Sequence, residues 1–309
     1  MLYRPFGRMG WNVSAVSMGT WNIGNQWGYL SDDQALDIVR AALDNGINLF
    51  DTADAYGIPH GMSELRLGKI IPSVRDKVFI VSKIGNWGLR SDDGLKFKSI
   101  DSVRLCGHAI CGRMKIEYAD VMLCHIANIE DPTVFIEGFQ ALVKEGFARE
   151  YGISTNNFDV FKRFYDISNG ECAVLELDYS LINKQPEEQI LDFCREHGVG
   201  VLVRGPLAMG VLAGKYDEST VFTDNVRAGW NDGQPGRAKY LDNLAKMRSV
   251  KGKLSEINPE LPLTQAAVRY VISHPAQPVA IPGMTSPKQV ADNAEAGKCV
   301  FTPQEFAQL

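Results

Sequence analysis

The sequence has little of what marks several large classes of protein. No apolar run approaches the roughly 20 residues of a membrane-spanning helix, and the N-terminal MLYRPFGRMGWNVS has no apolar core of signal-peptide length. The six cysteines form no CxxC pair and have no histidine partner at the spacing of a zinc site. We therefore expect free thiols in a reducing compartment, and a cytoplasmic protein with no membrane span and no bound metal.

An excess of basic charge is also absent. The chain of 309 residues carries 32 lysines and arginines against 37 acidic residues, a net charge of -5, and no basic run. This balance argues against a nucleic-acid-binding surface. Hydrophobic residues make up 45% of the chain, as in ordinary globular proteins. No linker or low-complexity tract interrupts the sequence, so we expect one domain over residues 1–309.

The chain does show a regular alternation of short apolar runs and amphipathic segments. Residues 32–46, 133–146 and 186–198 have helical spacing. In the last of these, Pro186 suits a first helical turn and Gly198 a C-terminal cap. The apolar runs, each a strand candidate, cover residues 15–20, 47–52, 78–83, 119–125, 148–154, 173–179, 199–205 and 278–283.

Eight strand candidates, most followed by a helix candidate, predict a (β/α)8 barrel, the TIM-barrel architecture. A doubly wound open sheet is the competing architecture, but it usually has GxGxxG after its first strand, and the first strand here ends SMGTWNIG. Before that strand, YRPFGRMGWNVSAVS is expected to form a β-hairpin. After the seventh strand, residues 214–237 form a long loop of the kind that often acts as a lid.

Polar residues stand at the ends of three consecutive strand candidates, where a barrel places its catalytic groups. The second strand ends at Asp51 and continues to Tyr56, the third ends at Lys83, and the fourth ends at His125. A tyrosine has an unperturbed pKa near 10, and a nearby ammonium such as Lys83 lowers the pKa towards the range of a useful general acid. Asp51 could fix the lysine, and His125 could orient a carbonyl oxygen. These parts suit protonation of an oxygen that becomes negative as a hydride reaches its carbon.

Taken singly, each of these four residues has an ordinary structural explanation. Asp51 could cap a helix, Lys83 could be a solvated strand end, and Tyr56 could be a packing aromatic. His125 could be a hydrogen-bonded histidine at the barrel rim. Four such residues at three consecutive strand ends favour a site over four independent accidents.

The motifs FDTADAYG, SKIG, a strand ending in histidine, and YGISTNN follow one another in an order that resembles the aldo-keto reductase family. The resemblance extends over nearly the whole chain and includes GMSELRLGK at 61–69, RGPLAMGVLAGKY at 204–216 and IPGMTSPKQVADN at 281–293. It looks closest to the bacterial general aldehyde and ketone reductases and to relatives of potassium-channel β subunits. It implies an NADP(H)-dependent reductase of aldehydes, ketones or sugar carbonyls. It also implies a catalytic tetrad, which falls here on Asp51, Tyr56, Lys83 and His125.

The resemblance further implies that NADP(H) binds extended across the barrel mouth, without a Rossmann fold. Ser154 and Thr155 would hold the nicotinamide carboxamide, and the ring would rest against the flat guanidinium of Arg204. The backbone that follows would receive the pyrophosphate, and residues 283–293 would meet the adenosine end. The implied cofactor residues are Thr20, Trp21, Ser154, Thr155, Glu176, Arg204, Gly205, Pro206, Leu207, Gly210, Leu212, Gly214, Lys215, Gly283, Thr285, Lys288, Gln289 and Asn293.

Two positions depart from the family pattern at the nicotinamide end. Thr155 stands where the family commonly has asparagine, and Glu176 where a glutamine usually binds the carboxamide. A carboxylate accepts but does not donate, so Glu176 could bond only the amide NH2. The eighth-strand segment also lacks the Lys and Arg that many members place on the 2′-phosphate, which leaves one cation, Lys288. NADP(H) is expected, with NAD(H) as the open alternative.

Four tryptophans lie in loops expected to surround the site. Each is a candidate either for an apolar substrate wall or for plain packing. They are Trp21, Trp27, Trp87 and Trp230. Two other functions stay open at this point: a cofactor-sensing binding subunit with slow or no turnover, and a Schiff-base aldolase that uses Lys83.

Overall fold

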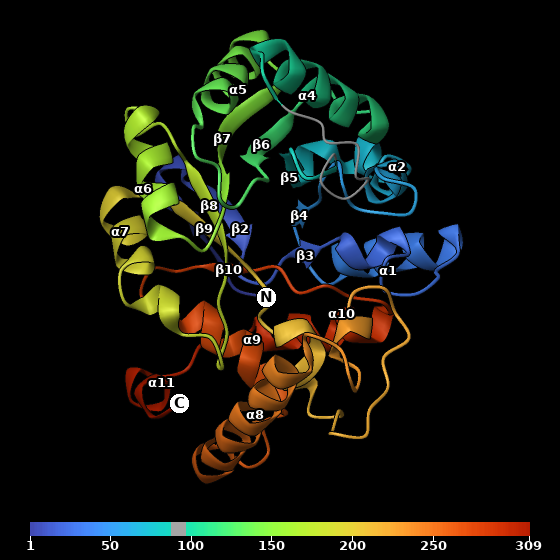
Figure 1. Ribbon diagram of the computed structural model, residues 1–309, viewed down its shortest axis with the longest axis vertical. Helices are drawn as coiled ribbons and strands as arrows, with labels where there is room; N and C mark the ends of the chain where they lie inside the picture. The colour runs from blue at the N-terminus through green and yellow to red at the C-terminus, as the bar shows by residue number, and fades with distance from the viewer. Residues whose placement is uncertain (88–96) are drawn as a thin grey trace.

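Eight parallel strands form one sheet that curls into a barrel in the computed structural model, which describes residues 1–87 and 97–309 (Figure 1). The strands are β3 (Met18–Gly19), β4 (Leu49–Asp51), β5 (Phe79–Ile84), β6 (Ala119–Cys124), β7 (Ala148–Ser154), β8 (Val174–Asp178), β9 (Gly200–Arg204) and β10 (Val279–Ala280). They are paired in chain order, from β3 to β10. Parallel bridges from Val16 to Ala280 and from Gly19 to Gly283 join the first strand region to the last. The predicted (β/α)8 barrel is therefore confirmed.

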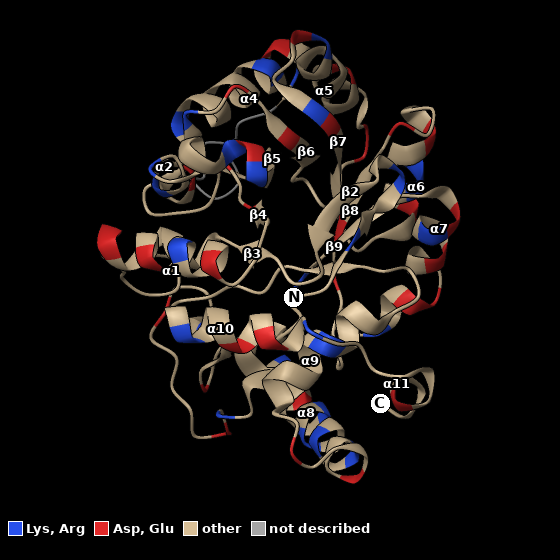
Figure 2. Ribbon diagram, turned by 180° about the vertical axis from the view of Figure 1, so that it is seen from behind, with Lys and Arg blue, Asp and Glu red and all other residues tan. Residues whose placement is uncertain are grey.

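Helices surround the strands, and Figure 2 shows most of the charged residues on this outer layer. The helices are α1 (Asp32–Asp44), α2 (Met62–Leu67), α4 (Ile100–Met114), α5 (Thr133–Glu145), α6 (Phe158–Ile167), α7 (Ile190–His197), α8 (Arg237–Ile257), α9 (Leu263–Ser273), α10 (Pro287–Ala296) and α11 (Pro303–Gln308). Helix α1 begins where predicted because Ser31 and Gln34 form a reciprocal capping box. Across the described ranges, no helix combines the length and apolar character needed to cross a bilayer.

The helix expected over 186–198 starts later than its sequence indicated. Pro186 lies in a short 3-10 turn, Gln185–Glu187, and Gln189 has φ of -148°, which is not helical. Helix α7 therefore begins at Ile190. Its predicted end is confirmed, because Gly198 has φ of 65°, a left-handed conformation that glycine adopts without strain.

The predicted N-terminal hairpin is present and covers one end of the barrel. Its strands β1 (Tyr3–Phe6) and β2 (Trp11–Ser14) pair antiparallel. The amide of Arg8 in the turn donates to the carbonyl of Gly198, just before β9 begins, and Phe6 packs with the apolar side chains inside the barrel. The hairpin therefore lies at the N-terminal ends of the strands, and the carboxyl ends remain available for a site.

A long connection follows β9 before α8 begins at Arg237. It contains two 3-10 segments, η5 (Ala208–Ala213) and η6 (Ala228–Trp230). Phe222, Trp230 and Tyr240 pack against one another, with the last two rings stacked at 5.3 Å between their centroids. This aromatic cluster anchors the connection on α8.

Candidate active site

Lys83 lies at the centre of a polar cluster inside the carboxyl end of the barrel. From β5 its Nζ donates to both carboxylate oxygens of Asp51, at 2.6 and 2.7 Å, and to the phenol oxygen of Tyr56 at 3.0 Å. It also donates to the carbonyl oxygen of Thr52 at 3.1 Å. The Lys83 side chain has no exposed surface, so its charge depends on these partners and not on water.

A second carboxylate reaches the same ammonium from a strand that does not neighbour β5. Glu176, on β8, places Oε2 3.1 Å from Nζ of Lys83. Its Oε1 accepts a 3.3 Å bond from the hydroxyl of Ser154, at the end of β7. Glu176 was expected only as a contact to the cofactor carboxamide. Its ion pair with Lys83 had no signal in the sequence, because β5 and β8 meet only across the barrel interior.

Burial controls the ionisation of this cluster. Desolvation opposes the charge on Lys83, but the carboxylates of Asp51 and Glu176 outweigh it and hold the pKa of Lys83 above its usual range. For Tyr56, burial raises the pKa to about 12, and the opposing effect of Lys83 does not offset it. The expectation that Lys83 brings the Tyr56 pKa below its ordinary value is therefore wrong for this state. Lys83 acts in the predicted direction, but desolvation is larger.

Aromatic rings frame Tyr56 on two sides. The ring of His125, which follows β6, meets the Tyr56 ring edge-on at 5.9 Å between centroids. Trp21 stacks on Tyr56 at 5.8 Å, and Trp27 packs edge-on against Trp21 at 5.1 Å. The structure thus brings together all four residues of the expected tetrad and two of the four tryptophans.

The other two tryptophans lie differently. Trp230 packs in the aromatic cluster with Phe222 and Tyr240, as described above, which is a packing role. Trp87 hydrogen-bonds the Cys106 thiol of α4. Neither contact joins them to Tyr56.

Gln26 is a functional candidate that sequence reasoning missed. Its Oε1 accepts from Nε1 of Trp21 at 2.5 Å and from the amide of Gly57 at 2.9 Å. It thereby fixes the Trp21 ring beside the loop that carries Tyr56. Within the described ranges, Nε1 of Trp27 is a buried donor with no acceptor, which gives this apolar wall one polar group.

Two hydroxyls expected to contact the cofactor already have protein partners. Thr155 donates to the carbonyl of Ala127 at 2.6 Å and accepts from the amide of Asn157. Thr20 donates to the carbonyl of Asp51 at 2.8 Å. Both residues are fully buried. Each hydroxyl donates its single hydrogen to a backbone carbonyl of the protein, and so holds a strand end in place. In this arrangement neither hydroxyl can also donate a hydrogen bond to a carboxamide.

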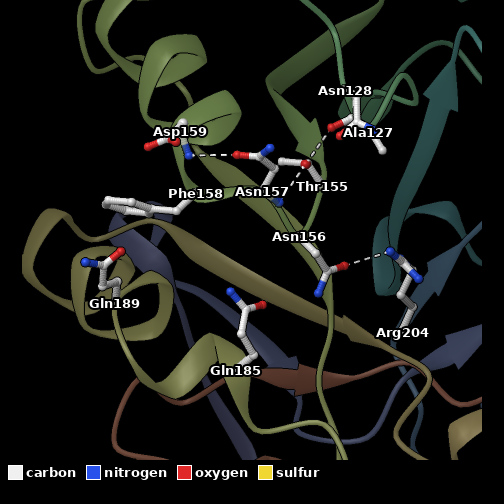
Figure 3. Close-up of a pocket in the computed structure, with 10 residues that line it drawn as sticks. All are labelled: Ala127, Asn128, Thr155, Asn156, Asn157, Phe158, Asp159, Gln185, Gln189 and Arg204. Carbon is white, nitrogen blue, oxygen red and sulfur yellow. Dashed lines mark hydrogen bonds between the residues drawn. The ribbon is translucent and has the colours of Figure 1, made fainter.

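Arg204 lies at the mouth of the barrel, at the end of β9. Its side chain is 46% exposed, and its Nε is 4.0 Å from Oε1 of Glu176. Asn156 fixes it by accepting from Nη2 at 2.8 Å (Figure 3). The same amide side chain also bonds the backbone of Asp178 on β8. Asn156 is a second residue that sequence reasoning missed. The sequence feature that could have identified Asn156 is its position two residues after Ser154, in the motif at the end of a strand.

A cavity of about 580 Å³ opens beside Arg204. Side-chain amides dominate its lining, together with the ring of Phe158 (Figure 3). The lining residues are Ala127, Asn128, Thr155, Asn156, Asn157, Phe158, Asp159, Gln185, Gln189 and Arg204. The cavity therefore adjoins the Glu176 end of the cluster through Arg204 and Thr155.

The segment expected to receive a pyrophosphate forms a tight turn after Arg204. Met209 and Gly210 have φ of 54° and 95°, which bends the backbone sharply within η5. Leu212 is buried and anchors this turn, whereas Lys215 is exposed. The remaining members of this expected set, Gly205, Pro206, Leu207 and Gly214, lie in the same turn region.

The segment expected at the adenosine end, 283–293, covers the residues that lead into α10 and most of that helix. The Thr285 amide and hydroxyl both donate to Oε1 of Gln289. Lys288 is paired with Asp292 at 2.7 Å, but its side chain is 83% exposed and free to reorient. Gly283 lies against Asn22 and bridges to the first strand region, and Asn293 is buried.

Comparison with known proteins decides the family. The sequence model described as Aldo/keto reductase family matches residues 15–309. The chain belongs to the aldo/keto reductase family. It is 29% identical to an uncharacterized oxidoreductase, YqkF, of Bacillus subtilis, with 100% of this chain and 95% of that protein covered. It is 28% identical to a probable voltage-gated potassium channel subunit beta of Oryza sativa, with 96% and 91% covered.

Solved structures agree with this assignment. An aldo-keto reductase of Bacillus halodurans in its holo form has a TM-score of 0.79 and 25% identity, covering 100% of this chain and 95% of that chain. An aldo-keto reductase of Klebsiella pneumoniae in complex with NADPH has a TM-score of 0.73 and 25% identity, covering 99% and 93%.

Proposed function

We propose that this aldo/keto reductase family member reduces an aldehyde, ketone or sugar carbonyl to the alcohol with NADP(H), and that Tyr56 is its general acid. The observation that carries the proposal is the hydrogen bond from Nζ of Lys83 to the phenol oxygen of Tyr56, inside a barrel mouth walled by Trp21. A phenol with a pKa of about 12 keeps its proton at neutral pH, as a proton donor must.

Each residue of the tetrad has a distinct task in this reaction. Tyr56 gives its proton to the carbonyl oxygen as negative charge develops there. The Lys83 ammonium stabilises the resulting phenolate, and Asp51 holds that ammonium at hydrogen-bond distance. His125, edge-on to the Tyr56 ring, orients the carbonyl oxygen.

NADP(H) fits the residues at the mouth and would supply the hydride to the carbonyl carbon. Arg204 offers a half-exposed planar guanidinium for ring stacking, and Oε1 of Glu176 retains acceptor capacity for a carboxamide NH2. Lys288, exposed at the start of α10, is the cation available to a 2′-phosphate. The relative of Klebsiella pneumoniae with NADPH bound supports this cofactor.

The test is oxidation of NADPH and NADH, in parallel, across a panel of aldehydes, ketones and oxidised sugars. We expect turnover with NADPH on part of this panel and a weaker rate with NADH. Equilibrium binding of both cofactors accompanies the assay. If neither cofactor binds, the proposal is wrong.

Likeness to a potassium channel β subunit supports one alternative, a cofactor-sensing subunit with slow turnover. This alternative predicts NADP(H) binding with slow or no reduction of the carbonyls on the panel. A Schiff-base aldolase fits poorly, because such a lysine must lose its proton and the carboxylates around Lys83 hold its pKa high. If the protein were such an aldolase, borohydride added with a carbonyl substrate would trap the substrate covalently on Lys83, whereas a reductase would not be trapped.

A further inference from the structure

The ion pair between Glu176 and Lys83 has no task in the reaction proposed above, where Glu176 serves only as an acceptor for the cofactor carboxamide. Glu176 crosses the barrel from β8 to reach Nζ of Lys83 at 3.1 Å, and its side chain is fully buried. Asp51 alone would neutralise Lys83, with both carboxylate oxygens within 2.7 Å of Nζ. A second buried carboxylate is costly unless it balances a further positive charge.

Arg204 supplies one such charge. Its Nε is 4.0 Å from Oε1 of Glu176, and its guanidinium is held in place by Asn156. The two carboxylates, Asp51 and Glu176, thus face two cations, Lys83 and Arg204. With an amide in place of Glu176, two cations would face a single carboxylate at this end of the barrel.

We propose that Glu176 sets the preference of this site between oxidised and reduced cofactor, in favour of the oxidised form. The inference rests on the proposed function, in which the nicotinamide ring lies against Arg204. The oxidised ring carries a positive charge and the reduced ring carries none. Arg204 repels the oxidised ring, and the Glu176 carboxylate offsets that repulsion, so Glu176 strengthens NADP+ binding more than NADPH binding.

The test compares the ratio of the dissociation constants for NADPH and NADP+ in the wild type and in Glu176→Gln. The constants come from titration calorimetry of the full chain, without substrate. We expect the substitution to lower the ratio Kd(NADPH)/Kd(NADP+) by about tenfold. The matched control is Glu171→Gln. Glu171 is exposed and lies just before the N-terminal end of β8, away from the site, so this substitution should leave the ratio unchanged.

A second variant keeps the inference testable if Glu176→Gln does not fold. Arg204→Gln removes the exposed cation that Glu176 balances, and should raise the same ratio. Opposite shifts in the two variants support the inference, and where Glu176→Gln does not fold, a rise in the Arg204 variant supports it. A folded Glu176→Gln with an unchanged ratio would overturn it. Equal changes in both dissociation constants with either substitution would overturn it, because Glu176 would then act only as a carboxamide contact. If the wild type binds neither cofactor, the proposed function itself is wrong.

Discussion

The ammonium of Lys83 lies 3.0 Å from the phenol oxygen of Tyr56, and both groups are buried inside the carboxyl end of the barrel. This pairing makes the acidity of Tyr56 depend on its surroundings. Before a substrate enters, burial keeps the phenol protonated, with a pKa of about 12. The lysine favours the phenolate, so its effect is largest when the proton has been transferred.

Replacing Tyr56 by Phe tests this role directly. We expect kcat for carbonyl reduction to fall at least about 100-fold, because the proton donor is lost while the ring and its stacking on Trp21 remain. The dissociation constant for NADPH should change little. Steady-state kinetics and equilibrium binding measure the two effects separately. Retention of reductase activity in this variant would contradict the assignment of the tetrad.

Replacing Lys83 by Met should lower stability strongly, as well as activity. The change leaves the buried carboxylates of Asp51 and Glu176 without their cation, at a cost of about 3 to 5 kcal/mol in the free energy of unfolding. Lys162→Met provides the control, because its pair with Asp166 is exposed and should contribute less than about 1 kcal/mol. Urea unfolding of both variants measures the two losses in the free energy of unfolding. A similar loss in the free energy of unfolding for both variants would mean that the buried carboxylates do not depend on Lys83 for their stability.

The sequence predicted these strand ends to within one residue, because an apolar run that stops at a polar residue marks a boundary that packing alone does not require. Strand β4 ends at Asp51 as predicted, whereas β5 ends one residue after Lys83 and β6 ends one residue before His125. The sequence could not predict the net effect on the Tyr56 pKa. Desolvation depends on how many residues from distant segments cover the phenol, and motif spacing carries no measure of that burial.

Long-range partners were equally hidden. Glu176 meets Lys83 across the barrel. The Thr155 hydroxyl donates to the carbonyl of Ala127, which lies in the loop after a different strand. Such contacts depend on strand register and tilt. Local signals did better: the helical spacing from residue 32 and the glycine after α7 were both informative.

Asp54 should make stability depend on pH near neutrality. Burial, and then the nearby Glu64 carboxylate, raise the pKa of Asp54 from 3.8 to about 7. The folded state therefore favours protonated Asp54. Its contribution to stability is fully present below about pH 3.8 and is lost as the pH rises through about 7, up to about 4 kcal/mol.

The variant Asp54→Asn removes this titration. Compared with the wild type, it should become relatively more stable at pH 8 than at pH 5, as measured by urea unfolding at each pH. Asp76→Asn, at an exposed position, is the control and should show the same difference from wild type at both values. An unchanged difference between wild type and Asp54→Asn at the two pH values would show that Asp54 is already ionised in the folded state.

Arg227 should hold the long connection after β9 over the site. Its guanidinium donates to Asp224 at 2.9 Å and to the Tyr216 hydroxyl at 2.7 Å, and it lies 5.3 Å from the ring centre of Trp27. Arg227→Ala removes this link between the connection and the aromatic wall. We expect faster proteolytic cleavage within residues 205–236 and a several-fold faster release of NADPH, since a loosened loop opens more often.

The control is Arg248→Ala, which removes a bidentate pair with Glu218 in the same connection. Both partners of that pair are about half exposed, at 53% each, so water replaces the lost bonds at little cost. Limited proteolysis followed by mass spectrometry, and stopped-flow release of NADPH, compare the two variants. Equal cleavage and release rates in both would mean that Arg227 does not fasten the connection, and that Phe222, Trp230 and Tyr240 are sufficient to hold it.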